Sequence, residues 1–87
     1  MPRFLDAHRL MGLDEEALRN LQNASLDEFG IKAVNLMYNR EEDKFYCLTD
    51  GPSKEAVQKH HNKHGFNCEW ITEVKTSAGL FWRVATV

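Results

Sequence analysis

A short stretch bounded by two glycines, GPSKEAVQKHHNKHG at residues 51–65, most constrains what this chain can fold into. Ser53 is a suitable helix N-cap, because a serine hydroxyl accepts hydrogen bonds from backbone N–H groups in the first helical turn. Gly65 is a suitable terminator, since glycine adopts the left-handed conformation that ends many helices. The stretch therefore predicts one short helix with a defined start and end, and the segments on both sides of it have the pattern of β-strands.

Four segments alternate between apolar and polar side chains with the period of a strand. They cover residues 3–9, 31–39, 44–49 and 69–75. Apolar residues occupy both faces of the first segment, which indicates a central strand. An earlier helix is expected from an N-cap at Asp14 to near Glu28, with Gly30 as its terminator. On the strand at 31–39, Val34 and Leu36 are expected on one face, and Ala33, Asn35 and Met37 on the other.

The order β-α-β-β-α-β predicts an α+β protein with a ferredoxin-like βαββαβ sandwich, sheet order 4-1-3-2 and both helices on one face. Residues 1–75 form this domain. Alternation resumes at residues 80–87, so residues 76–87 are expected to form an additional C-terminal strand or dimer arm. Large apolar residues also occupy the other sheet face, and such a face is a liability when exposed. We therefore expect a homodimer in which two sheets pack together as a dimeric α/β assembly.

Charge and hydropathy exclude several classes of protein. The chain carries 13 acidic and 11 basic residues and has no dense basic cluster, which argues against binding to nucleic acid. No apolar run approaches the length of a membrane span, and the N-terminus MPRFLDAHRL lacks a signal-peptide core. We expect a cytoplasmic protein without membrane association. In that reducing compartment, Cys47 and Cys68 are expected to be free thiols.

Two polar residues on the first strand are unusual for a central position. Asp6 and His8 share one face, and buried polar groups there must find partners. In the predicted fold the third strand lies beside the first and the second helix packs across both, so Cys47 and His61 can approach the pair. Alternation alone leaves open which face of the first strand meets the helices. Imidazole, thiolate and carboxylate ligands together suit nickel, zinc or copper.

Each of these residues also has a purely structural interpretation. Asp6 and His8 can be a hydrogen-bonded pair within a dimer interface. Cys47 can be a small buried apolar residue. His61 can be a core residue of an amphipathic helix, with the polar end of its ring satisfied by a neighbour.

Two further histidines, His60 and His64, lie one helical turn apart near the end of the second helix. They either remain in solvent, interact as cations with the negative end of the helix dipole, or join a surface metal site. The sequence leaves these alternatives open.

Three segments, MPRFLDAHRL, FYCLTDGPSKEAVQKHHNKHG and EWITEV, carry a family resemblance. Their pattern is a Phe-x-Asp-x-His strand, a Phe/Tyr-Cys-Leu strand that runs into Gly-Pro-Ser-Lys-Glu-Ala-Val, and a His four residues after that Val. In these features the chain resembles a family of small bacterial proteins first catalogued as a domain of unknown function and also described as nickel-binding. The resemblance covers about residues 2–75 and is strongest over 45–65.

The resemblance implies a ferredoxin-like homodimer and places Asp6, His8, Cys47 and His61 at family positions. It implies nickel as the metal, with zinc or copper as alternatives. The resulting hypothesis is a small soluble metal-binding protein that acts in metal response or storage. One alternative is a small-molecule enzyme of the dimeric α/β-barrel type, with His8 or His61 as general base oriented by Asp6. Another is a dimeric regulatory or interaction module without a site.

Overall fold

The computed structural model describes residues 1–24 and 26–77, so the strand predicted at 80–87 lies outside the described residues. The elements follow the predicted order: β1 (Arg3–Arg9), α1 (Glu15–Gln22), β2 (Lys32–Asn39), β3 (Lys44–Asp50), α2 (Lys54–Lys63) and β4 (Trp70–Val74). Each predicted strand agrees with the observed one to within one residue at either end.

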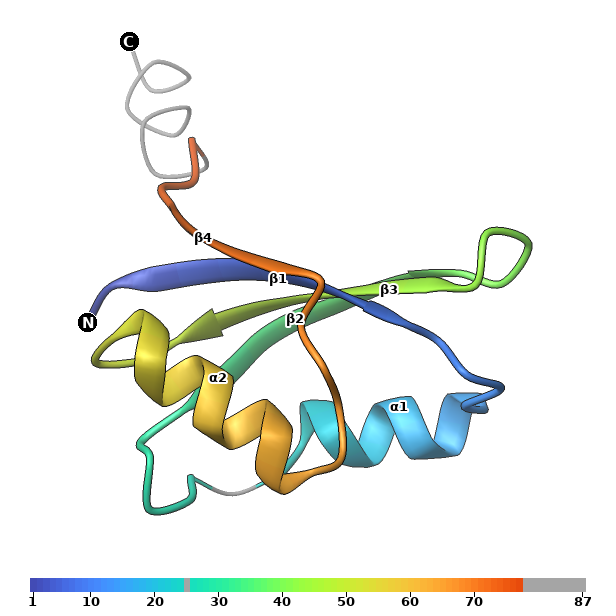
Figure 1. Ribbon diagram of the computed structural model, residues 1–87, viewed down its shortest axis with the longest axis horizontal. Helices are drawn as coiled ribbons and strands as arrows, with labels where there is room; N and C mark the ends of the chain where they lie inside the picture. The colour runs from blue at the N-terminus through green and yellow to red at the C-terminus, as the bar shows by residue number, and fades with distance from the viewer. Residues whose placement is uncertain (25, 78–87) are drawn as a thin grey trace, which may run out of the picture.

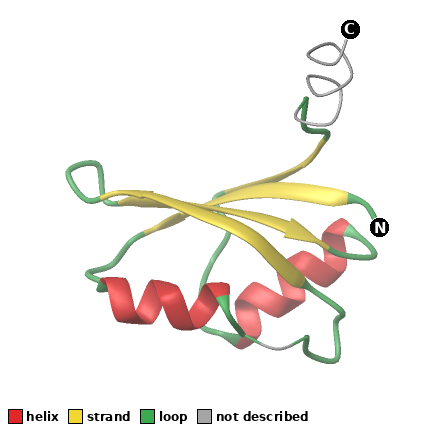
Figure 2. Cartoon of the chain, turned by 180° about the vertical axis from the view of Figure 1, so that it is seen from behind, coloured by secondary structure: helices red, strands yellow, loops and turns green. Residues whose placement is uncertain are grey.

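The four strands form one antiparallel sheet in the order β2-β3-β1-β4, which is the predicted order. Both helices lie on the same side of this sheet (Figures 1 and 2). The molecule is thus a small α+β protein whose arrangement is consistent with the ferredoxin-like fold. β1 lies between β3 and β4, as the apolar residues on both of its faces predicted.

Both helices begin at the predicted N-caps. The side chain of Asp14 accepts a hydrogen bond from the N–H of Ala17 at 2.9 Å, and Ser53 accepts one from the N–H of Ala56 at 3.1 Å. These bonds satisfy donors that the first helical turn leaves free. Among the described residues, neither helix has the length and apolar character needed to cross a lipid bilayer.

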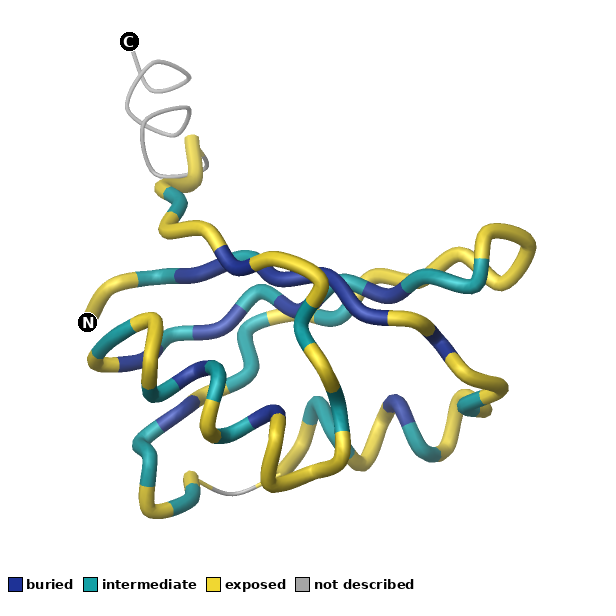
Figure 3. The backbone as a smooth tube through the Cα atoms, viewed as in Figure 1, coloured by how far each residue is buried: buried dark blue, intermediate teal, exposed yellow. Residues whose placement is uncertain are grey.

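The face of β1 that meets the helices carries Phe4, Asp6 and His8, all of which are buried. This observation answers the question that alternation left open. In the register of the sheet, Asp6 lies opposite Cys47 of β3 on one side and opposite Ile71 of β4 on the other. Figure 3 shows the buried positions concentrated where the sheet and the helices face each other.

The apolar core consists of two clusters. Phe4, Ile31, Val57 and Ile71 form one of them, and Leu10, Leu18, Phe45 and Cys47 form the other. Because Asp6 is paired with Ile71 of the first cluster and with Cys47 of the second, its carboxylate lies at the boundary between them. The polar residues of β1 are therefore enclosed by apolar packing on both sides.

The first helix is shorter than predicted, because α1 ends at Gln22 rather than near Glu28. The Asp27 carboxylate accepts a hydrogen bond from the N–H of Phe29 at 2.9 Å. Such a local side-chain bond stabilises a turn in place of a helix. Gly30, with φ 70°, ends this turn instead of the helix and donates its N–H to the carbonyl of Asp27 at 3.0 Å.

The faces of β2 also differ from the prediction. The pairing with β3 shifts register between Ala33 and Asn35, so Val34 is the additional residue of a β-bulge. A bulge reverses the alternation beyond it. As a result, Ala33 shares the helix-covered face with Leu36, whereas strict alternation placed Ala33 with Asn35 and Met37.

Gly51 is buried where β3 turns into α2, and its N–H donates to the carbonyl of Pro2 at 3.1 Å. A Cβ at this position would lie 2.4 Å from Cδ1 of Ile31. We expect Gly51→Ala to lower the free energy of unfolding by about 1–3 kcal/mol, because the overlap displaces a core side chain. Urea denaturation measures the loss.

The control is Ile31→Val, which removes the clashing methyl group at a cost of about 1 kcal/mol. The double variant should lose less stability than the sum of the two single variants, since the residues are in contact. Strict additivity would mean that the clash with Ile31 is not the cause.

Candidate metal centre

Four side chains that are far apart in the sequence meet where β1, β3 and α2 pack together. They are Asp6, His8, Cys47 and His61, the four residues that the sequence analysis selected. Their exposed fractions are 0%, 1%, 5% and 5%. Each offers one potential ligand atom, and the four atoms all lie within 4.8 Å of one another. We call this set the buried cluster.

Neighbouring elements position each member of the cluster. The antiparallel register of β1 and β3 places Asp6 directly opposite Cys47. His8 follows Asp6 by two residues and therefore shares its face. His61 follows Val57 by one helical turn, and Val57, with no exposed surface, anchors that face of α2 in the core.

The two imidazole rings are held in the same way. His8 Nδ1 donates a hydrogen bond to the carbonyl of Asn67 at 3.1 Å, and His61 Nδ1 donates to the carbonyl of Val57 at 2.9 Å. Because a carbonyl oxygen only accepts, both Nδ1 atoms carry the proton and both Nε2 atoms are directed inward. Metal-binding histidines are commonly oriented by such a bond from the second ring nitrogen.

Both Nε2 atoms converge on one oxygen, Oδ1 of Asp6. His8 Nε2 forms a short hydrogen bond with it, which requires a shared proton, so this pair is neutral overall. His61 Nε2 lies 3.7 Å from the same oxygen. Burial lowers the pKa of His61 by more than the charge of Asp6 raises it, so its ring stays neutral. The Nε2 lone pair of His61 therefore faces a carboxylate oxygen.

The cluster also contains an unsatisfied acceptor and a protonated thiol. Oδ2 of Asp6 has no hydrogen-bond partner among the described residues, which costs about 1–3 kcal/mol for a buried polar atom. Burial, together with the negative charge of Asp6, raises the pKa of Cys47 far above its ordinary value. Cys47 is thus a thiol at neutral pH, and the cluster has acceptors in excess of donors.

These residues fit a divalent transition-metal ion. Ligand bonds of about 2.0–2.3 Å around such an ion place neighbouring ligand atoms about 3–4 Å apart, which is within the spread of the cluster. Two imidazole nitrogens, a sulfur and a carboxylate oxygen form a mixed set that nickel, zinc and copper all accept. A cation would satisfy Oδ2 of Asp6 and the lone pair of His61 together.

A small cavity of about 30 Å³ adjoins the cluster between the sheet and the two helices. Cys47, Thr49 and His61 are among the residues that line it, and Thr49 Oγ1 is a second buried polar atom without a partner in the described part of the chain. The same cavity is also lined by His60 and His64. It has room for one or two water molecules.

His60 and His64 belong to a second group, together with Asp27. The Asp27 carboxylate accepts a hydrogen bond from His60 Nδ1 at 2.5 Å. Burial alone would raise the pKa of Asp27, but the bonds from His60 and Phe29 and the nearby charge of Lys63 hold it below its ordinary value. The sequence analysis missed Asp27 because it lay inside the predicted first helix, and no spacing connects it with α2.

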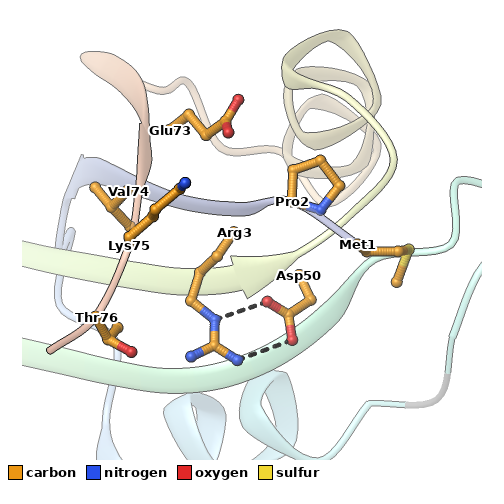
Figure 4. A pocket seen from close by; sticks show the side chains of 8 residues that line it. All are labelled: Met1, Pro2, Arg3, Asp50, Glu73, Val74, Lys75 and Thr76. Atoms are coloured by element: carbon orange, nitrogen blue, oxygen red, sulfur yellow. Dashed lines mark hydrogen bonds and ion pairs between the residues drawn. The ribbon is translucent and has the colours of Figure 1, made fainter. Parts of the chain in front are cut away.

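Several larger surface hollows lie outside the cluster in the described part of the chain, and two of them are lined by residues of β1. One, of about 300 Å³, opens between the ends of β1 and β4, and in its lining Arg3 binds Asp50 at 2.7 and 3.1 Å (Figure 4). The other, of about 490 Å³, reaches the far side of His8. Both ring nitrogens of His8 already have hydrogen-bond partners, so neither is free to act as a base toward a molecule in this hollow.

A family model described as nickel-responsive protein, SCO4226-like, matches residues 4–74. The chain belongs to the SCO4226-like family. The resemblance noted in the sequence is thereby confirmed, and all four residues of the buried cluster lie within the matched range. The crystal structure of SCO4226 from Streptomyces coelicolor A3(2) is similar, with a TM-score of 0.73 and 31% identity over 87% of this chain and 99% of that one. No curated protein matches the chain.

The environment of His61 predicts how stability of this SCO4226-like chain depends on pH. Since the pKa of His61 is lower in the folded state than its ordinary value of 6.5, the unfolded chain binds more protons just below pH 6.5. We expect the metal-free protein to lose stability as the pH falls from about 7.5 to about 5.5, with a slope contribution of at most about 1.4 kcal/mol per pH unit. Urea denaturation at both pH values measures it.

His61→Gln is the matched control, because its amide does not titrate in this range. The variant should show a shallower loss of stability with falling pH than the native chain. Equal slopes would exclude His61 as the residue responsible.

Proposed function

We propose that this protein is a small metal-binding protein that acts in metal response or storage, and that the buried cluster of Asp6, His8, Cys47 and His61 binds the ion. The observation that supports this most directly is the His61 Nε2 lone pair directed at the Asp6 carboxylate. Two acceptors that face each other in the core repel unless a cation or proton lies between them. Membership of a nickel-responsive family favours nickel, and zinc or copper would fit the same ligand types.

The charge of the cluster supports an exchange of protons for metal. Without metal, the proton shared with His8 balances the negative charge of Asp6, and the Cys47 thiol is neutral, so the cluster carries no net charge. On binding, the S–H bond of Cys47 breaks to give a thiolate, and the shared proton leaves His8. The two positive charges of a divalent ion then balance the negative charges of Asp6 and the Cys47 thiolate. Both states are neutral, so neither leaves a net charge buried in the core.

An enzyme with a histidine general base is the weaker candidate. His8 has both nitrogens occupied, and in the described part of the chain His61 lines a cavity of about 30 Å³, which is too small for an organic substrate. The hollow of about 490 Å³ beside His8 reaches no free base. A module without any site does not account for Oδ2 of Asp6, which is buried without a hydrogen-bond partner among residues 1–24 and 26–77.

We also propose that the protein forms a homodimer through the sheet face that the helices leave uncovered. Leu5, Ala7, Met37, Tyr46, Leu48 and Trp70 occupy this face. Met37 and Trp70 are 41% and 44% exposed, and the Tyr46 and Trp70 rings lie 6.3 Å apart. Burial of such a patch against a second copy would remove apolar surface from water.

Substitution of each of the two cysteines in turn tests whether nickel binds at the buried cluster. Tag-free protein should bind nickel and develop a thiolate-to-nickel absorption band. Cys47→Ser should abolish the band and weaken binding at this site at least about tenfold, because a ligand is lost. Cys68→Ser, at the half-buried thiol outside the cluster, should leave both unchanged. Titration calorimetry and absorption spectroscopy provide the measurements.

The same titration in two buffers of different ionisation enthalpy counts released protons. The charge-neutral exchange predicts about two protons per nickel ion bound at the cluster. No thiolate band in the native chain would contradict the proposed site. A band without proton release would contradict the charge-neutral exchange alone.

The proposed dimer is tested with Leu48→Arg, which introduces a charge at the centre of the uncovered face, opposite Leu5 and Asn35. Light scattering should give twice the mass of one chain for the native protein and the mass of one chain for the variant, since burial of an unpaired charge is unfavourable. Glu16→Arg, on the exposed surface of α1, is the control and should remain a dimer. A native mass equal to one chain would exclude the dimer.

A further inference from the structure

We propose that Asp27, His60 and His64 form a second, outer site for a divalent transition-metal ion, and that this outer site loads the buried cluster through the cavity between them. The binding part of the proposal stands by itself. The loading part rests on the proposed function of the buried cluster.

The outer residues have the arrangement of a chelating site. His60 and His64 are one helical turn apart at the C-terminal end of α2, and their ring centroids are 4.8 Å apart. Asp27 reaches them from the turn before β2, with Oδ2 2.5 Å from Nδ1 of His60. One ligand atom from each residue lies within 4.8 Å of the other two. Two imidazoles at this helical spacing plus a carboxylate give three of the ligands that nickel or zinc accepts.

Electrostatics at this position favours a cation. The C-terminal end of α2 carries the negative end of the helix dipole, and His64 is the C-cap residue there. Asp27 adds a carboxylate that is held in its ionised form. The neighbouring positive charge of Lys63 is paired with Glu28 at 2.7 Å, which reduces its repulsion of an incoming ion.

The outer group differs from the buried cluster in accessibility. The side chains of His60 and Asp27 are 17% and 10% exposed, and His64 is exposed. Three protein ligands leave further positions to water, so an ion there remains exchangeable. The buried cluster has four ligands and at most 5% exposure for any of them. An ion that reaches the buried cluster must therefore pass between side chains that cover it.

The cavity of about 30 Å³ connects the two sets of ligands. Its lining includes His60 and His64 of the outer site as well as Cys47 and His61 of the buried cluster. The His60 ring meets the His61 ring edge-on, with centroids 5.2 Å apart. Because two ligands of each set line the same cavity, it is the route that the proposed loading step would use.

The decisive variant is His64→Gln in the full, tag-free chain, with nickel alone as the probe. It removes one exposed imidazole and keeps the size of the side chain. The matched control is Asn62→Gln on the exposed surface of the same helix. Equilibrium dialysis counts bound nickel, and stopped-flow absorption follows the thiolate-to-nickel band. That band reports the buried cluster only, because the outer site contains no sulfur.

We expect His64→Gln to reduce binding from about two nickel ions per chain to about one. The thiolate band should reach its native amplitude but form at least about tenfold more slowly. Asn62→Gln should behave as the native chain, and thermal melting should show that both variants are folded. Native stoichiometry together with a native rate in His64→Gln would overturn the proposal. Reduced stoichiometry with a native rate would overturn loading and retain the outer site.

Cys47→Ser separates failure of this proposal from failure of the proposed function. This variant should still bind about one nickel ion, and adding His64→Gln should remove it. If the native chain shows no thiolate band but nickel binding depends on His64, the outer site is supported and the buried cluster is not. If the band forms normally in His64→Gln, the buried cluster is supported without an outer loading site.

Discussion

The Asp6 carboxylate is the constraint on which the rest of this structure depends. It has no exposed surface, lies on an inner strand of the sheet, and receives a hydrogen bond from the described residues at only one of its two oxygens. An ionised carboxylate in such a place is expensive unless positive charge accompanies it. The proton shared with His8 supplies that charge in the metal-free state. A divalent ion would supply it more fully, since it could also engage Cys47 and His61.

The ferredoxin-like arrangement explains why such a cluster can exist in a small chain. The central strand provides two residues on one face, the adjacent strand adds a thiol in register, and the second helix adds an imidazole from above. Apolar clusters on both sides limit the contact of the group with water to the adjoining cavity of about 30 Å³. Rigid strands and one anchored helix hold ligands more accurately than loops would. The outer group differs, because its residues lie at the end of α2 and in the turn before β2.

Much of this arrangement was predictable from local patterns. Alternation gave the strands to within a residue, and Asp14 and Ser53 gave the helix starts. The end of α1 was not predictable, because the carboxylate of Asp27 competes for the backbone in a turn that helical spacing does not reveal. The bulge at Val34 was not predicted for a related reason. One inserted residue moves the side chains beyond it to the opposite face of the sheet without changing the composition of the strand.

The sequence by itself determined the type and order of the elements and the residue types available as ligands, because strand and helix periods and capping groups are local properties. Only the tertiary structure decided which face of β1 meets the helices, and hence that Asp6 and His8 are enclosed with His61 rather than exposed on the other sheet face. It also decided that Asp27 joins His60 and His64. The physical reason is that strand register and helix packing together reduce the exposed apolar surface of the whole chain. That total surface cannot be read from any single segment of the sequence.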